Sequence, residues 1–185
     1  MKRKALILID IQNDYFPGGA NPLKESHEAA LNAGKVLKRF RSEGDAVIHI
    51  QHISIRKGSQ FFLPETTGAE IHEIVHPLDN EKVILKHYPN SFRNTELLSV
   101  LKSIEISQLV FCGMMTHMCV DATVRAAKDF AFDSILISDA CATKDLEIKD
   151  KKIRAQEVHL SFLAALNGFY SEVKTSEEYL QFNQE

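Results

Sequence analysis

The residue of this sequence best placed for nucleophilic chemistry is a cysteine at the start of a predicted helix. Residues 109–127 read LVFCGMMTHMCVDATVRAA, in which a short apolar run and a glycine precede apolar residues spaced three and four apart. Cys119 therefore falls where a buried strand gives way to a helix. Unpaired N–H groups in the first turn of a helix, together with the positive end of its dipole, favour a thiolate over a thiol. We therefore expect thiolate character at Cys119.

The other two cysteines lack this position. Cys112 lies inside the apolar strand pattern, and Cys141 lies in the segment SDACA. Free cysteine is usually buried and packs as a small hydrophobic residue, which is the interpretation we adopt for both. The same interpretation stays open for Cys119 unless a base and an oxyanion site are found close to it.

Two charged residues stand at the ends of predicted strands. Asp10 lies in the apolar run ALILIDI of residues 5–11, and Lys86 closes the run KVILK of residues 82–86. Each taken alone has a structural explanation, as a capping acid and a solvated rim charge. Together with Cys119 they suggest chemistry, because a carboxylate can take up a thiol proton when a neighbouring cation adjusts the pKa values of the pair. An ammonium held close by can orient or polarise a carbonyl group.

Gly113 offers room for a tight turn just before the cysteine helix. Such a turn would let the backbone N–H groups of Met115 and Cys119 converge on a developing oxyanion. The alternative is that Gly113 only reverses the chain direction.

The elements that must position these residues alternate along the chain. The patterns predict strands and helices in turn, which implies a parallel sheet covered on both faces. Ligands bind such sheets beyond the carboxyl ends of the strands. The expected fold is a doubly wound, three-layer α/β/α domain with a six-stranded, mainly parallel Rossmann-like sheet. The expected strands are residues 5–11, 46–53, 82–86, 106–112, 132–138 and 169–174, and the expected helices are residues 25–43, 94–103, 150–166 and 176–182, besides the one after Cys119.

A long segment without periodicity, residues 54–68, carries three consecutive large apolar side chains. Phe61, Phe62 and Leu63 must be covered, since each loses about 1.5–3 kcal/mol if left in water. They either fill the core or line a pocket, and contact with a neighbouring subunit is one way to bury them. On this ground we expect a homodimer or homotetramer with two-fold contacts.

The chain length and the net charge exclude several other classes of protein. The chain of 185 residues fits one domain spanning residues 1–185, and a net charge of −3 from 22 basic and 25 acidic residues argues against nucleic-acid or membrane partners. The apolar run after the basic start is too short for a signal peptide. Three cysteines, an odd number, fit a reducing compartment. We expect a cytoplasmic protein with a small-molecule substrate.

Three segments in register resemble the isochorismatase-like cysteine hydrolases, the superfamily that includes the nicotinamidases. They are LILIDIQNDYF around Asp10, ILKHYPNSF around Lys86, and GMMTHMCVDATVRAA around Cys119. The resemblance implies Cys119 as nucleophile, Asp10 as its proton acceptor and later donor, and Lys86 as their electrostatic partner. It also implies a cis peptide bond between Met114 and Met115, with the amides of Met115 and Cys119 forming the oxyanion hole.

One departure concerns metal. Nicotinamidases resemble one another in an Asp-x-His metal site after the second strand, but here that region reads Gln51-His52-Ile53-Ser54. Scattered histidines without a carboxylate partner are weak ligand candidates. The sequence therefore resembles the non-metal branch, and we expect neither metal nor another cofactor.

The function expected is hydrolysis of a carbon–nitrogen bond of a small molecule through a thioester. Alternatives are a nicotinamidase proper and a non-catalytic ligand-binding member. A phosphoryl-transfer or receiver-like domain would need a second carboxylate near Asp10, where Gln12 stands, and a dinucleotide binder would need a glycine-rich turn that is missing. The residues expected to bind substrate are Phe16, Phe61, Tyr88, Phe92 and His117, with Tyr15 and Phe62 as further aromatic candidates. A place in the core is the alternative for each of them.

Overall fold

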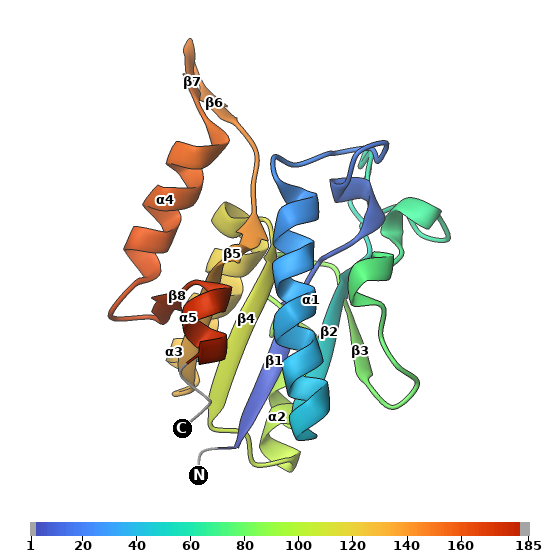
Figure 1. Ribbon diagram of the computed structural model, residues 1–185. Coiled ribbons are helices and arrows are strands. Elements are labelled where there is room, and N and C mark those ends of the chain that lie inside the picture. Colours follow the sequence, from blue (N-terminus) through green and yellow to red (C-terminus); the bar gives the residue numbers. More distant parts are fainter. Residues whose placement is uncertain (1–2, 182–185) are drawn as a thin grey trace.

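A six-stranded parallel sheet forms the centre of the computed structural model, which describes residues 3–181. Apolar runs that are buried on both faces build its middle strands (Figure 1). The strand order is β3-β2-β1-β4-β5-β8, and every neighbouring pair is parallel. The expected doubly wound α/β fold is therefore confirmed. The strands are β1 (Lys4–Ile9), β2 (Ala46–His52), β3 (Lys82–Lys86), β4 (Gln108–Met114), β5 (Asp133–Ala142) and β8 (Glu172–Lys174).

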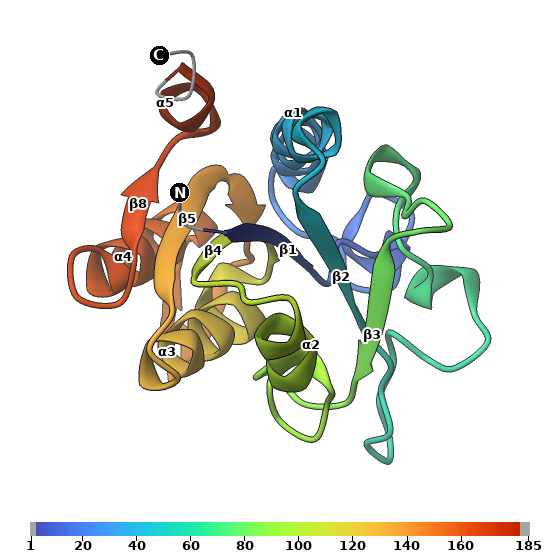
Figure 2. The same cartoon turned by 90° about the horizontal axis from the view of Figure 1, so that it is seen from below.

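Helices cover both faces of this sheet and complete the three layers (Figure 2). On one face lie α1 (Ser26–Glu43) and α5 (Ser176–Gln181), and on the other lie α2 (Leu97–Ser103), α3 (Asp121–Asp129) and α4 (Ala155–Leu166). Gly44 ends α1 in the left-handed conformation with φ of 70°, as the sequence predicts. Short helical turns occur in the connections: η1 (Asn13–Tyr15), η2 (Thr67–Ala69), η3 (Glu73–Val75) and η4 (Thr116–Val120).

Successive side chains of the central strands enter two different cores. Leu6 and Leu8 of β1 belong to the cluster that contains the buried side of α1, whereas Ile7 and Ile9 belong to the cluster with α2 and α3. This is the two-residue period of a strand with both faces buried.

The chain reverses its direction of winding beside β1. From β1 it proceeds to β2 and β3 on one side, then crosses to β4 on the other. Asp10 follows β1 directly and the Cys119 turn follows β4, so both lie at this switch point, where open α/β sheets bind ligands. The two strands approach closely here, because Ile9 pairs with Gly113.

One predicted helix begins too early. The pattern of residues 150–166 predicts a helix throughout, but residues 151–153 form β7 (Lys151–Ile153), which pairs with β6 (Leu146–Ile148) in an antiparallel hairpin. The hairpin projects from the sheet above α4 in Figure 1. Lys149 takes the left-handed conformation in its turn, and the helix starts only at Ala155. The expectation failed because a run rich in lysine carries no periodicity that distinguishes a short exposed strand from a helix.

The apolar loop of residues 54–68 is covered by its own chain. The Phe62 side chain is 1% exposed and packs on Tyr15, with ring centroids 4.6 Å apart, while Leu63 remains 39% exposed. Phe62 therefore needs no cover from a neighbouring subunit. A homodimer or homotetramer remains a prediction without that support. Within residues 3–181, no helix is long and apolar enough to cross a bilayer.

Two glycine replacements should have opposite effects on stability. A Cβ atom at Gly113, where φ is 142°, would overlap the backbone carbonyl of Ile9, whereas Gly34 in α1 has only ordinary contacts with Ile74. We expect Gly113→Ala to lower the free energy of unfolding by at least about 2 kcal/mol. Gly34→Ala should raise it by about 0.5–1 kcal/mol. Denaturant unfolding of both variants measures the difference, and equal stability of Gly113→Ala and the wild type would contradict the close approach of β4 to β1.

Candidate active site

Four neighbouring strands bring four chemically active side chains to one edge of the sheet. Lys86 is the last residue of β3, His52 the last of β2, Asp10 follows β1, and Cys119 lies in η4 after β4. Lys86 and His52 are paired in register. The three residues predicted from the sequence are almost fully enclosed, with exposures of 0% for Asp10, 1% for Lys86 and 2% for Cys119.

The Lys86 ammonium is held by three acceptors. Its Nζ atom donates to Asp10 Oδ2 at 2.7 Å, to His52 Nδ1 at 3.1 Å and to the Tyr88 carbonyl oxygen at 3.2 Å. An ammonium has three N–H groups, so these bonds use all of them. Burial is the largest single influence and by itself would lower the pKa of Lys86, but the charge of Asp10 and the further interactions with Asp10 and Cys119 together raise it. Lys86 is therefore a fixed positive charge.

The Asp10 carboxylate uses only one of its oxygens in this ion pair. Oδ1 is buried and has no hydrogen-bond partner among the described residues. The backbone of Asp10 takes the left-handed conformation, with φ of 51°, and its N–H donates to the Ile50 carbonyl at 3.0 Å. A carboxylate oxygen of Asp10, a ring nitrogen of His52 and the Cys119 sulfur all lie within 4.8 Å of one another. The second oxygen is thus available to accept a proton in this group.

The Cys119 thiol is protonated at rest. Burial, followed by the negative charge of Asp10, raises its pKa well above the ordinary value, and the opposing effect of Lys86 is smaller. The expectation that the helix start produces a thiolate is therefore wrong for the resting protein. Cys112 and Cys141 are also buried, and burial raises the pKa of Cys141 to about 12.

The peptide bond between Met114 and Met115 is cis, which confirms the expectation from the resemblance. Met115 immediately precedes η4, so its N–H and that of Cys119 belong to the beginning of this helical segment. The Met115 carbonyl at the start of this segment accepts from the N–H groups of Met118 and Val120, at 3.0 and 3.2 Å.

His52, which the sequence offers as a weak metal-ligand candidate, lies within the buried group beside Lys86. Burial lowers the pKa of His52 to about 4, so the ring is neutral near pH 7 and its Nδ1 accepts a hydrogen bond from the Lys86 ammonium. The Gln12 amide holds the backbone of His52, since it donates to the carbonyl at 2.9 Å and accepts from the N–H at 2.7 Å. The signal was present, because His52 stands at a predicted strand end as Lys86 does.

Two of the residues expected to bind substrate border the buried group. The Phe61 ring lies 5.9 Å from that of Tyr15, and burial, with the negative charge of Asp10, raises the pKa of Tyr15 well above its ordinary value. Tyr88 contributes its carbonyl to Lys86.

The other three lie farther out or in the core. Phe16 stacks on His72 with ring centroids 3.7 Å apart. Phe92 is buried in the hydrophobic cluster beneath α2 and α3, and His117 is hydrogen-bonded to the Thr143 hydroxyl. Substrate contacts from these residues remain predictions.

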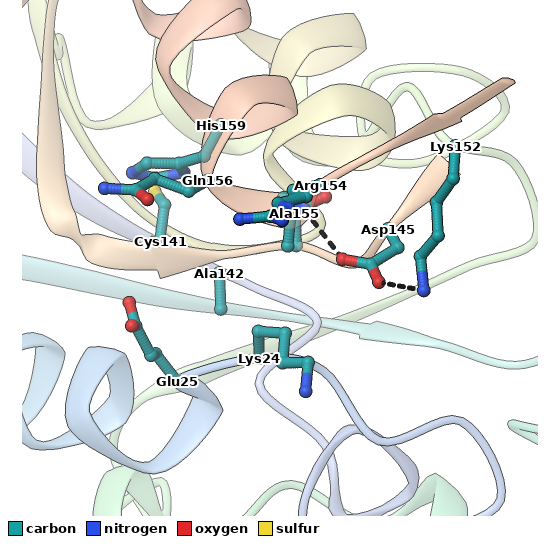
Figure 3. A pocket seen from close by; sticks show the side chains of 11 residues that line it. Lys24, Glu25, Cys141, Ala142, Asp145, Lys152, Arg154, Ala155, Gln156 and His159 are labelled. Carbon is teal, nitrogen blue, oxygen red and sulfur yellow. Dashed lines mark hydrogen bonds and ion pairs between the residues drawn. The ribbon is translucent and has the colours of Figure 1, made fainter. Parts of the chain in front are cut away.

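An open cavity of about 670 Å³ lies one strand away, beyond the carboxyl end of β5. At its rim, the Asp145 carboxylate accepts a hydrogen bond from the Ala155 N–H at 2.8 Å and forms an ion pair with Lys152 at 2.8 Å (Figure 3). Its walls include Cys141 and His159 but none of the residues Asp10, Lys86 or Cys119.

The group Asp10, His52 and Cys119 has a composition that can bind a metal ion. Lys86, however, donates to both Asp10 and His52 from a single ammonium. A cation placed there would meet this fixed positive charge at short range. The expected absence of metal therefore remains a prediction, and the position of Lys86 supports it.

A family model for the isochorismatase domain matches residues 4–164. The chain belongs to the isochorismatase family. The family protein YddQ of Bacillus subtilis is 51% identical over 177 residues, which cover 96% of this chain and 98% of YddQ. A solved isochorismatase hydrolase from Oleispira antarctica superposes with a TM-score of 0.93 at 43% identity, covering 97% of both chains.

Two further relatives have more specific names. The nicotinamidase of Escherichia coli is 27% identical over 187 residues, covering 81% of this chain and 88% of the enzyme. A solved cysteine hydrolase from Pseudomonas syringae superposes with a TM-score of 0.91 at 25% identity, covering 97% of this chain and 91% of the other.

The lowered pKa of His52 predicts how stability depends on pH. Between about 6.5 and about 4 the unfolded chain binds a proton at His52 and the folded protein does not. The wild-type protein should therefore lose stability as pH falls through this window, by at most about 1.4 kcal/mol per pH unit from this residue. His52→Gln removes this contribution. We would measure the free energy of unfolding of both proteins from pH 7.5 to 4.5. The variant should become more stable relative to the wild type as the pH falls. A stability difference that does not change with pH would contradict the lowered pKa of His52.

Proposed function

We propose that this member of the isochorismatase family hydrolyses a carbon–nitrogen bond of a small molecule through a thioester on Cys119. The observation that supports this most directly is the free oxygen of Asp10. Lys86 neutralises Oδ2, Oδ1 remains without a hydrogen-bond partner in the described part of the chain, and a carboxylate oxygen of Asp10 lies within 4.8 Å of the Cys119 sulfur. A thiol that is protonated at rest needs such an acceptor at the moment it attacks.

The first half of the reaction forms the thioester. The Cys119 proton passes to Asp10 Oδ1 as the sulfur adds to the substrate carbonyl carbon. The backbone N–H groups of Met115 and Cys119 stabilise the oxyanion of the tetrahedral intermediate. When the intermediate collapses, the carbon–nitrogen bond breaks and the amine leaves with the proton held by Asp10.

The second half restores the thiol. Asp10 accepts a proton from a water molecule that adds to the thioester carbonyl, and the carbon–sulfur bond then breaks. The proton returns from Asp10 to the departing sulfur, and the carboxylic acid is released. Lys86 keeps its proton throughout, since its three N–H groups are engaged, and it holds Asp10 in place.

The names of relatives support hydrolysis of an amide-type bond. One relative is a nicotinamidase and one structural neighbour is a cysteine hydrolase. The chain is accordingly a hydrolase of this family, and amide hydrolysis by Cys119 is our proposal for its chemistry. The same groups could act on an ester, so a screen of amides and esters with purified protein is the first experiment.

Replacing the nucleophile or the base should abolish turnover. We expect Cys119→Ala and Asp10→Asn each to lower kcat by at least roughly 10³-fold on any substrate found, with Cys141→Ala as the matched cysteine control that stays active. Asp10→Asn leaves a buried ammonium without its counter-charge, at a cost of about 3–5 kcal/mol, so circular dichroism must show that it is folded. Wild-type turnover by folded Asp10→Asn would exclude Asp10 as the base.

Chelation should leave the activity unchanged. The Lys86 ammonium provides the positive charge in this site, and no step requires a Lewis acid. Assays before and after treatment with a chelator, combined with metal analysis of the purified protein, test this. Stoichiometric zinc or iron whose removal abolishes turnover would contradict it and would favour a nicotinamidase-like metal mechanism.

A further inference from the structure

Phe62 forms an aromatic wall beside the proposed catalytic group. Its ring lies 4.6 Å from that of Tyr15 in an edge-to-face arrangement and 5.7 Å from that of His52. The surrounding loop of residues 54–68 begins without helix or strand and reaches η2 only at Thr67. The ring is nevertheless 1% exposed. Something other than secondary structure must hold it in place.

The backbone of Phe62 is fixed from both sides. Its φ of 56° lies in the left-handed region, which bulky residues adopt only where the surroundings enforce it. The Phe62 N–H donates to Asp14 Oδ2 at 2.6 Å, and its carbonyl accepts from the Ser54 N–H at 2.8 Å. The short bond to a carboxylate belongs to the stronger class of hydrogen bonds.

Asp14 connects two segments that are distant in the sequence. Its other oxygen, Oδ1, accepts from the Ala20 N–H at 3.1 Å, and the residue is 6% exposed. Gly68 packs so closely against this carboxylate that a Cβ atom there would collide with it. Throughout residues 3–181, no Lys, Arg or His forms an ion pair with Asp14. The charge of this buried acid is thus satisfied by backbone N–H groups.

We propose that Asp14 is a positioning residue that fastens the loop over the catalytic thiol and thereby places the Phe62 ring as a wall of its chamber. The proposal rests on the proposed function in one respect, that the chamber contains the reacting Cys119. It assigns Asp14, which lies four residues beyond Asp10 and outside the strand, a task separate from proton transfer.

The accessibility of Cys119 gives a direct test. The N–H groups of Phe62 and Ala20 bind different oxygens of Asp14, and in Asp14→Asn one of these oxygens becomes an NH₂ group that cannot accept. The loop should open more often, and brief iodoacetamide treatment followed by peptide mapping should label Cys119 about tenfold faster than in the wild type. Cys112 and Cys141 in the same sample are the internal controls, and their labelling should not change.

A matched control is Glu81→Gln. Glu81 is likewise a buried carboxylate that accepts a backbone N–H, that of Leu78 at 2.9 Å, but it precedes β3 at the amino ends of the strands. This variant should label Cys119 at the wild-type rate. Asp14→Asn with unchanged Cys119 labelling would overturn the proposal, as would equal acceleration at all three cysteines, which would show a general loss of stability.

A double variant tests whether Asp14 acts through Phe62. Phe62→Ala should itself expose Cys119, and adding Asp14→Asn to it should give less than a twofold further increase in labelling. If the two substitutions increased the labelling rate of Cys119 independently, so that their factors multiplied in the double variant, the proposal would be contradicted. Phe62→Ala also keeps the test decisive if Asp14→Asn does not fold, because wild-type labelling in Phe62→Ala would show that the ring does not cover the thiol.

Labelling does not depend on turnover, so the two proposals can fail separately. If no amide or ester is hydrolysed but Asp14→Asn uncovers Cys119, only the proposed function fails. If hydrolysis through Cys119 is established and its labelling is the same in Asp14→Asn, only the role of Asp14 fails.

Discussion

The ion pair between Lys86 and Asp10 is the interaction on which the site depends. Both side chains are removed from water, and the desolvation of two such charges costs several kcal/mol each unless the geometry is close and the remaining polar atoms are satisfied. Lys86 meets that condition completely, with three acceptors for three protons. Asp10 meets it only in part, because one oxygen has no partner in the described structure. The protein therefore retains one unsatisfied acceptor beside its thiol, a local cost to stability that a hydrolase can use.

The pair also explains why the thiol is not ionised. A single lysine beside a cysteine would favour a thiolate, but here the charge of Asp10 opposes that of Lys86 and burial disfavours any further charge. The protonated Cys119 sulfur and the unpartnered oxygen of Asp10 both result from this arrangement of charges. In the proposed reaction, the nucleophile is generated during attack, when the proton transfer and the new carbon–sulfur bond occur together.

The sequence predicts most of the sheet and the ends of its strands, because apolar runs of five to seven residues mark strands buried on both faces. Asp10, Lys86 and Cys119 followed from that pattern, since the carboxyl ends of parallel strands meet. His52 stands at such an end and was treated only as a metal-ligand candidate. The hairpin of β6 and β7 has no periodicity that would predict it. The backbone N–H of Phe62 is bonded to Asp14, which is 48 residues away. Contacts of that range leave no local pattern.

The order of the strands has a consequence for how the protein is made. β1, which leads into Asp10, pairs with β2 about forty residues later, but its other neighbour is β4, where Lys4 pairs with Gln108. A ribosome must therefore synthesise well over one hundred residues before β1 has both partners, and Cys119 is added only after that strand. Such long-range pairing slows folding and leaves apolar strand edges exposed in the meantime. The first element of the candidate active site to be synthesised therefore lacks one of its two neighbouring strands until the last element of that site is nearly made.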